Sequence, residues 1–136
     1  MTQILKFRLL LLLLLLMPIG CAMVADRIIQ KYDIAVVNTT EHRINGVVVR
    51  ISSRLFPVGT VQPRSASRLK DITTPPSSQV TVQWHDVDGL LYKKTLSVSD
   101  DFIWDFNGRS VIFTIVPGNN ALIKYTKEYG KGGAQN

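Results

Sequence analysis

The densest group of side chains that could bind a metal ion lies at residues 85–89, where the sequence reads His-Asp-Val-Asp-Gly. His85, Asp86 and Asp88 offer nitrogen and oxygen ligands, and alternating oxygen ligands before a glycine are typical of the start of a calcium loop. No bidentate glutamate follows, because the chain continues as Leu-Leu-Tyr. Asp and Gly are also favoured in tight turns. We therefore predict a hairpin turn and no metal or other cofactor, with these three side chains as the only metal candidates.

Catalytic residues are not arranged in any recognisable pattern in this chain. No serine lies in a Gly-x-Ser-x-Gly turn, and the sequence contains no glycine-rich phosphate loop. Asp100 and Asp101 form a pair of carboxylates, but they follow Ser99 in a stretch typical of a solvated turn. His42 stands alone in another polar segment. The sequence thus predicts a protein that is not an enzyme.

The first twenty-one residues have the pattern of an export signal. Lys6 and Arg8 precede eight consecutive leucines, and the sequence Met-Pro-Ile-Gly-Cys follows them. Such a positive region stays in the cytoplasm while the apolar run enters the membrane, and small residues mark the cleavage site. Cys21 is the only cysteine, so it has no disulfide partner within the chain. Acylation would give this single thiol of an exported protein a role.

The segment Pro18-Ile19-Gly20-Cys21 resembles the lipobox of bacterial lipoproteins, and the chain resembles small uncharacterised members of that group. Gly20 and Cys21 match the pattern, whereas Pro18 stands where the family usually has an aliphatic residue. The resemblance implies that Cys21 carries fatty acids such as palmitate and anchors the protein in a membrane of the cell envelope, facing the periplasm. Ala22 stands where an aspartate commonly retains such proteins at the inner membrane, which implies the outer membrane.

Two other interpretations of the N-terminal segment stay open. Residues 9–25 contain no charged side chain, and seventeen residues is the lower limit for a membrane-spanning helix. An uncleaved anchor is therefore one alternative. Ordinary signal cleavage near Gly20 or Ala25 is the other. All three interpretations predict export.

Loss of residues 1–20 leaves 116 residues, which is enough for one domain with a core of its own. Without Lys6 and Arg8, 14 basic residues remain against 10 acidic ones, a net charge of +4. Six basic residues occupy a stretch that has no acidic residue: Arg43, Arg50, Arg54, Arg64, Arg68 and Lys70. On one face they would form a patch for an anionic lipid headgroup or an acidic envelope protein, and the alternative is a scatter over solvent faces. Nucleic acid is not expected as a partner, because the chain carries an export signal.

Alternating apolar residues predict short β-strands in the chain after residue 31. In residues 79–85 the alternation turns Trp84 inward, and Asp86 to Gly89 supply a tight turn. Phe102, Trp104 and Phe106 also alternate, which predicts a strand whose rings fill the core. An exposed Trp104 would instead be an anchor for a protein partner.

Seven or eight short strands without a sustained helical period predict an all-β fold. We expect an antiparallel β-sandwich, immunoglobulin-like or transthyretin-like, or a small barrel, after an N-terminal signal helix. The expected parts are a signal peptide (1–20), a lipidated Cys21 with a tether (21–31), the sandwich domain (32–128) and a disordered tail (129–136). The predicted function is a non-enzymatic envelope lipoprotein that binds another envelope component or acts as an accessory subunit of an assembly. The alternative is a module that binds a small ligand or a metal ion at the 85–89 turn.

Overall fold

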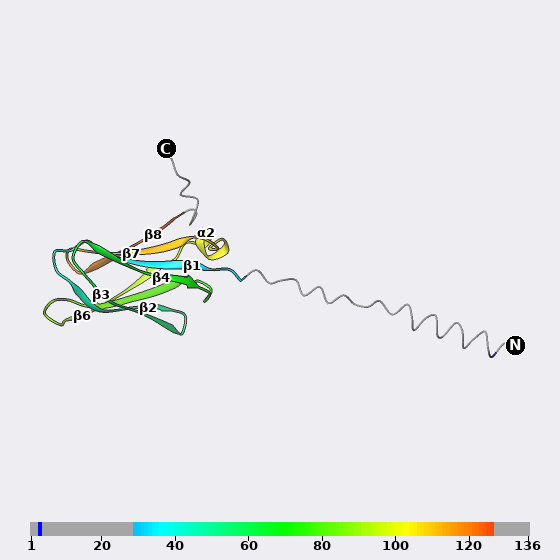
Figure 1. The fold of residues 1–136 in the computed structure, drawn as a ribbon, viewed down its shortest axis with the longest axis horizontal. Helices are drawn as coiled ribbons and strands as arrows, with labels where there is room; N and C mark the ends of the chain where they lie inside the picture. Colours follow the sequence, from blue (N-terminus) through cyan, green and yellow to red (C-terminus); the bar gives the residue numbers. More distant parts are fainter. Residues whose placement is uncertain (1–2, 4–28, 127–136) are drawn as a thin grey trace, which may run out of the picture.

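The computed structural model describes Gln3 and residues 29–126, and residues 29–126 form two β-sheets packed face to face (Figure 1). The rest of the predicted signal peptide, Cys21 and the predicted tail (129–136) lie outside the described residues. Each sheet has four strands. The predicted β-sandwich is confirmed, and neither sheet closes into a barrel within the described part of the chain.

The first sheet has the strand order β4-β1-β7-β8. Its strands are β1 (Tyr32–Asn38), β4 (Ser65–Ile72), β7 (Ser110–Val116) and β8 (Asn120–Tyr125). The second sheet has the order β3-β2-β5-β6. Its strands are β2 (Ile44–Ile51), β3 (Arg54–Val61), β5 (Gln79–His85) and β6 (Leu91–Ser97). This order differs from that of immunoglobulin domains, where the first, second, fifth and fourth strands share a sheet.

One strand pair departs from the antiparallel pattern that we expected. β1 and β7 run in the same direction, with Asp33 opposite Ser110 and Asn38 opposite Ile115. Because β1 lies between β4 and β7, its outward-facing Asp33 and Ala35 are buried as well as its inward-facing residues. Because both faces of β1 are buried, its sequence is a nearly continuous run of apolar residues and does not alternate between apolar and polar residues.

The core between the sheets is built from alternate residues of the inner strands. Val47, Val49 and Ile51 of β2 lie beside Val82 and Trp84 of the neighbouring strand β5, and all five are buried in one core cluster. Trp84 is fully buried, so its predicted inward orientation is confirmed. Each buried aliphatic or aromatic side chain of this size contributes about 1.5–3 kcal/mol through removal of apolar surface from water.

The strand predicted at residues 102–106 is wrong, because the chain forms the short helix α2 (Asp100–Trp104) there. Ser99 caps this helix by accepting a hydrogen bond from the backbone N–H of Phe102, and Asp100 and Asp101 lie in its first turn, where carboxylates are favoured. Residues two apart in a helix lie on nearly opposite sides, so Phe102 is buried in the core whereas Trp104 is exposed to solvent. Phe106 lies beyond the C-cap residue Asp105 and packs against the core from there.

Helix α2 closes the end of the sandwich at which β1 begins (Figure 1). The ring of Phe102 packs edge-on against Tyr32, with ring centroids 5.6 Å apart, and lies 4.9 Å from the ring of Tyr125. Phe106 packs edge-on against Tyr32 from the other side. The five residues of α2 therefore cover the apolar core at this end.

Within the part of the chain that the structure describes, no helix is long and apolar enough to cross a membrane.

Candidate functional site

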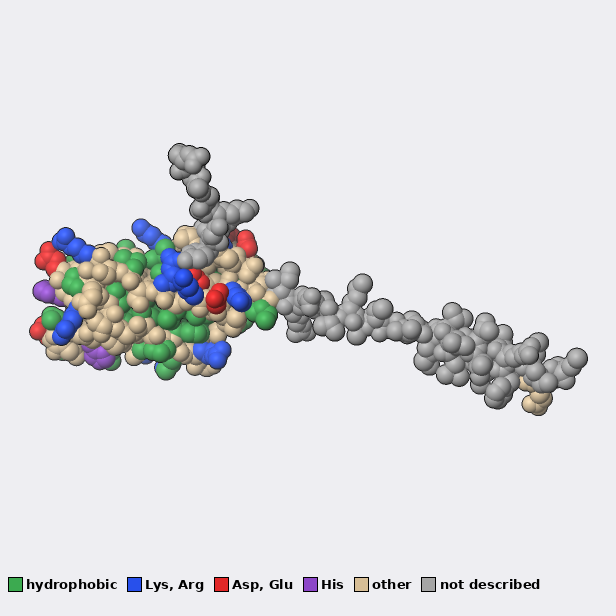
Figure 2. Space-filling view, viewed as in Figure 1, with side chains coloured by type: hydrophobic (Ala, Val, Ile, Leu, Met, Phe, Trp, Pro, Cys, Tyr) green, Lys and Arg blue, Asp and Glu red, His purple; other side chains and the backbone are tan. Residues whose placement is uncertain are grey.

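Four loops meet at the end of the sandwich opposite α2 and line a cleft of about 700 Å³. They are the β1–β2 loop, the β3–β4 turn, the β5–β6 turn and the β7–β8 turn. The charged residues of this loop cleft are Glu41, Arg43, Arg64, Asp86 and Asp88, and His42 lines it as well. Figure 2 shows acidic, basic and histidine side chains gathered at the left end of the domain, away from the start of β1. The cleft is therefore polar and of mixed charge.

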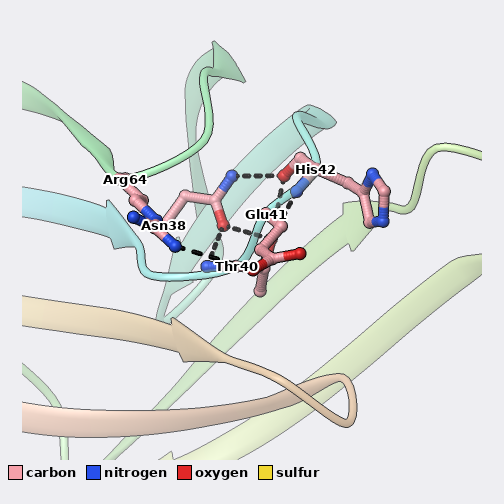
Figure 3. A network of polar contacts seen from close by, with 5 residues as sticks. All are labelled: Asn38, Thr40, Glu41, His42 and Arg64. Atoms are coloured by element: carbon pink, nitrogen blue, oxygen red, sulfur yellow. Dashed lines mark hydrogen bonds and ion pairs between the residues drawn. The ribbon is translucent and has the colours of Figure 1, made fainter.

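Asn38, the last residue of β1, holds two of these loops together (Figure 3). Its side-chain amide is fully buried and donates hydrogen bonds to the backbone carbonyls of His42 (2.7 Å) and Val61 (3.1 Å). Its side-chain oxygen accepts from the backbone N–H and the hydroxyl of Thr40. An asparagine side chain commonly bonds to backbone two residues on in this way. The β1–β2 loop is thus fixed against the end of β3.

Arg64 and Glu41 form an ion pair across the mouth of the loop cleft, with a guanidinium nitrogen 3.5 Å from a carboxylate oxygen (Figure 3). Both side chains are largely exposed, and such a pair contributes little to stability because water and salt screen it. Arg64 also has a φ of 53°, in the left-handed region that residues other than glycine rarely adopt. Because the ion pair is exposed, little free energy is lost when it opens. The Arg64 guanidinium can therefore bind a carboxylate of another molecule in place of Glu41.

The 86–89 segment forms the hairpin turn that the sequence predicts. One carboxylate oxygen of Asp86 accepts hydrogen bonds from the backbone N–H groups of Asp88 and Leu90, both at 2.9 Å. Gly89 has a φ of 81° and donates its N–H to the Asp86 carbonyl. The carboxylate of Asp86 is therefore engaged in shaping the turn, as aspartate is at such positions.

The hydroxyl group of Tyr92 belongs to the same neighbourhood. Burial, followed by the negative charge of Asp86 and a hydrogen bond to it, raises the pKa of Tyr92 above its ordinary value. Asp88 adds a smaller effect in the same direction, and a hydrogen bond with Asn119 of the β7–β8 turn opposes it. The Tyr92 hydroxyl therefore lies near side chains of both the β5–β6 turn and the β7–β8 turn.

His85 does not join Asp86 and Asp88 in the loop cleft. It lies at the end of β5 on the outer face of the second sheet, opposite Asn45 and Leu91. A Cβ atom added to Gly46 would lie 3.0 Å from His85 Nδ1, so the imidazole packs over the backbone of β2. Among the described residues, no three His, Cys, Asp or Glu side chains are grouped as metal ligands would be.

The six basic residues of the predicted patch are divided by the fold. Arg43 and Arg64 line the loop cleft. Arg50 and Arg54 lie in the β2–β3 hairpin at the other end of the sandwich, where Arg50 is opposite Leu55 and Arg54 is opposite Ile51. Arg54 also donates to the hydroxyl of Thr74. The structure thus separates the first pair of arginines from the second pair by the length of a strand.

The remaining two basic residues of the predicted patch belong to the edge strand β4. Arg68 lies 3.6 Å from the buried carboxylate of Asp33 on β1, and this ion pair connects the two strands. Lys70 is exposed and lies on the same strand, next to the bulge opposite Asp33. Arg68 therefore has a structural role, because it compensates a carboxylate that is largely shielded from water.

The chain matches no protein-family model, and no curated protein matches its sequence. Its fold is similar to that of the NMR structure of a protein from Eubacterium rectale, with a TM-score of 0.51. The two chains are 10% identical, and the likeness covers 75% of this chain and 92% of the other. At this identity the likeness is one of fold alone.

Several residues of the loop cleft were not predicted from the sequence to belong to a functional site. The sequence did not single out Asn38, Glu41 or Asn119 as site residues, and it showed His42 only as an isolated histidine in a polar segment. An Asn-Thr-Thr sequence directly after an apolar run does signal a side-chain-supported turn. No local pattern, however, links that turn to residues 64, 86 and 119, since the strands bring these positions together only in the fold.

Proposed function

We propose that this protein is an exported, non-enzymatic lipoprotein that is acylated at Cys21 and uses the loop cleft to bind another protein of the cell envelope. The export signal and the lipobox-like segment support the anchor. The described chain enters the domain at Lys31, beside α2, and the loop cleft lies at the opposite end. A domain held through Cys21 would then present the loop cleft away from its membrane. The entry of the chain at Lys31, at the end opposite the loop cleft, is the observation that carries the proposal.

The position of the cleft favours a protein partner over an anionic lipid headgroup. Headgroups of the anchoring membrane would be nearest to α2, whereas the cations Arg43 and Arg64 lie at the far end. The cleft also exposes Glu41 and Asp88, which oppose the binding of an anion and suit a surface with charges of both signs. We therefore assign the cleft to an envelope protein, with the domain as an accessory subunit of an assembly.

The polar groups at the cleft support a binding role better than a catalytic one. The Asp86 carboxylate accepts hydrogen bonds from backbone N–H groups, and Arg64 is paired with Glu41. The side-chain amide of Asn38 donates its hydrogen bonds to loop carbonyls. Asp88 and His42 are exposed, so neither has the secluded environment in which a catalytic group is usually tuned. Complementary charge and shape are what such a cleft can offer a partner.

The anchor is tested by growing cells with a labelled fatty acid and separating their membranes. The wild-type protein is expected to carry the label and to fractionate with the outer membrane. Cys21→Ser is expected to lose the label, because no other cysteine is present to accept it. Label that persists in Cys21→Ser would refute acylation at this residue, and an unlabelled wild-type protein of full length would favour an uncleaved anchor.

The partner site is tested by charge reversal at the two ends of the domain. Arg43→Glu combined with Arg64→Glu is expected to abolish crosslinking to the envelope partner, since both guanidinium groups line the cleft. Arg50→Glu combined with Arg54→Glu makes the same change of charge at the opposite end and serves as the matched control. If the control pair abolishes crosslinking and the cleft pair does not, the partner binds elsewhere and the proposal for the cleft fails.

A further inference from the structure

Trp104 is the most exposed large apolar side chain of the described domain. It ends helix α2 with 85% of its surface accessible, although Phe102, two residues earlier, is 1% exposed. Phe102 therefore closes the core, whereas Trp104 on the same helix faces solvent. An indole ring left in water keeps a large apolar area unburied, and Trp is the residue most favoured at the boundary between water and lipid headgroups.

The same end of the domain receives the chain from its N-terminal segment. The backbone N–H of Lys31 donates to the side-chain oxygen of Asn107 at 2.9 Å, and the N–H of Gly108 donates to the Lys31 carbonyl at 2.8 Å. These bonds fix the start of β1 against the loop that follows Trp104. Ile29, just before, is also 66% exposed. The exposed tryptophan and the incoming chain therefore share one surface.

The chain between Cys21 and the domain is short. Ten residues separate Cys21 from β1, and ten residues reach at most about 35 Å when fully extended. Fatty acids on Cys21, as proposed above, would hold this end of the chain in a bilayer. A membrane that holds Cys21 is thus within reach of Trp104 and is the nearest apolar surface available to it.

Charges around this end of the domain nearly cancel. The exposed cations at this end are Lys31, Arg50, Arg54 and Lys70, and the exposed carboxylates are Asp71, Asp100, Asp101 and Asp105. Arg109 is occupied, since it donates to the carbonyls of Asp105 and Thr126. A contact made here gains little from an anionic lipid, which points to a surface of zwitterionic headgroups.

We propose that Trp104 inserts into the headgroup region of the bilayer that holds the chain's own N-terminal segment, so that α2 lies against the membrane. The contact rests on the membrane attachment proposed above and adds to it a fixed orientation of the domain. The loop cleft then faces away from the lipid. An interfacial tryptophan buries its ring among headgroups while its N–H keeps a polar partner, so no deep insertion of the domain is required.

The full chain, purified from membranes and reconstituted into phosphatidylcholine vesicles, allows a direct test. Brominated phosphatidylcholine quenches tryptophan emission only within contact distance. The emission of Trp104 is expected to shift to shorter wavelength and to be quenched by the brominated lipid, while iodide in the buffer loses access to it. Trp84 is fully buried, and Trp104→Phe isolates its contribution, which is expected to respond to neither quencher.

A matched reporter at the other end of the domain checks the orientation. Val87 is 52% exposed in the β5–β6 turn, so Val87→Trp in the Trp104→Phe background places one exposed tryptophan at the loop cleft. Iodide is expected to quench the emission of this reporter, and the brominated lipid is not. Quenching of both reporters by the lipid would overturn the proposed orientation.

The outcomes also separate this inference from the membrane attachment. If the protein floats with the vesicles and Trp104 remains open to iodide, the attachment stands and the lipid contact is refuted, which leaves Trp104 as a site for a protein. If the protein does not float, both proposals fail. If Trp104 is protected only when anionic lipid is added, and salt reverses the protection, the zwitterionic contact is wrong.

Discussion

The side-chain amide of Asn38 donates a hydrogen bond of 3.1 Å to the backbone carbonyl of Val61, so a fully buried polar group joins the end of β1 to the end of β3. The two strands belong to different sheets. The same amide also reaches the carbonyl of His42. One side chain therefore closes the sandwich at the loop cleft and sets the course of the loop that lines it.

Replacing Asn38 is expected to destabilise the domain. Asn38→Ala leaves the carbonyls of Val61 and His42 without their donor, and loss of a buried hydrogen-bond partner costs about 1–3 kcal/mol. Urea unfolding measures the change in free energy. Thr60→Ala, which removes an exposed bond to Asn45, serves as the control and is expected to change stability by less than about 0.5 kcal/mol. Equal effects of both variants would contradict the role given to Asn38.

Two aromatic residues of α2 are expected to behave in opposite ways. Phe102→Ala opens a cavity beside Tyr32 and Tyr125, and truncation of a buried phenylalanine costs about 3–5 kcal/mol. Trp104→Ala removes a side chain that faces solvent and is expected to cost less than about 0.5 kcal/mol. Thermal unfolding of the two variants compares them directly. A large loss of stability in Trp104→Ala would restore the strand interpretation, in which that ring fills the core.

Stability is expected to fall at alkaline pH because of Tyr32. Its hydroxyl donates to the carbonyl of Thr74 at 2.8 Å, and burial raises the pKa of Tyr32 above its ordinary value of about 10. In the unfolded chain the phenol therefore loses its proton first, so the stability that Tyr32 contributes is complete below pH 10 and declines as the pH rises above it.

The test of this pH dependence is a comparison of Tyr32→Phe with the wild type in urea unfolding between pH 7 and pH 11. Tyr32→Phe is expected to lose about 1 kcal/mol at neutral pH, through the bond to Thr74, and to show a flatter decline above pH 10. Tyr125→Phe retains the Tyr32 hydroxyl and is expected to retain the alkaline decline. An unchanged slope in Tyr32→Phe would assign the decline to another group.

Metal ions are expected to leave the domain unaffected. One oxygen of the Asp86 carboxylate already accepts two backbone N–H groups at 2.9 Å, and His85 lies on the outer face of the sheet. Millimolar calcium or zinc should therefore not raise the melting temperature, whereas Asp86→Ala should lower stability by about 1 kcal/mol through loss of the turn. A melting temperature that rises with calcium in the wild type but not in Asp88→Asn would support the ligand-binding alternative.

The sequence predicted much of the fold because the relevant signals are local. Alternation in residues 79–85 places Val80, Val82 and Trp84 inside, and their burial follows from the two-residue period of a strand. The Asp-Val-Asp-Gly segment produces its turn because glycine adopts the positive φ at Gly89 without strain. The helix α2 was missed because the alternation of Phe102, Trp104 and Phe106 fits a strand, whereas the helix that buries Phe102 and exposes Trp104 ends before Phe106.

The sequence by itself thus determined the all-β class, most strand positions, the hairpin at Gly89 and the N-terminal signal pattern, since each depends on neighbours along the chain. The tertiary structure decided that β1 pairs in parallel with β7, that the six basic residues divide between two ends and edge strand β4, and that Trp104 faces solvent. These features depend on contacts between segments far apart in sequence. No local pattern specifies such contacts, because they are selected by the packing of the whole core.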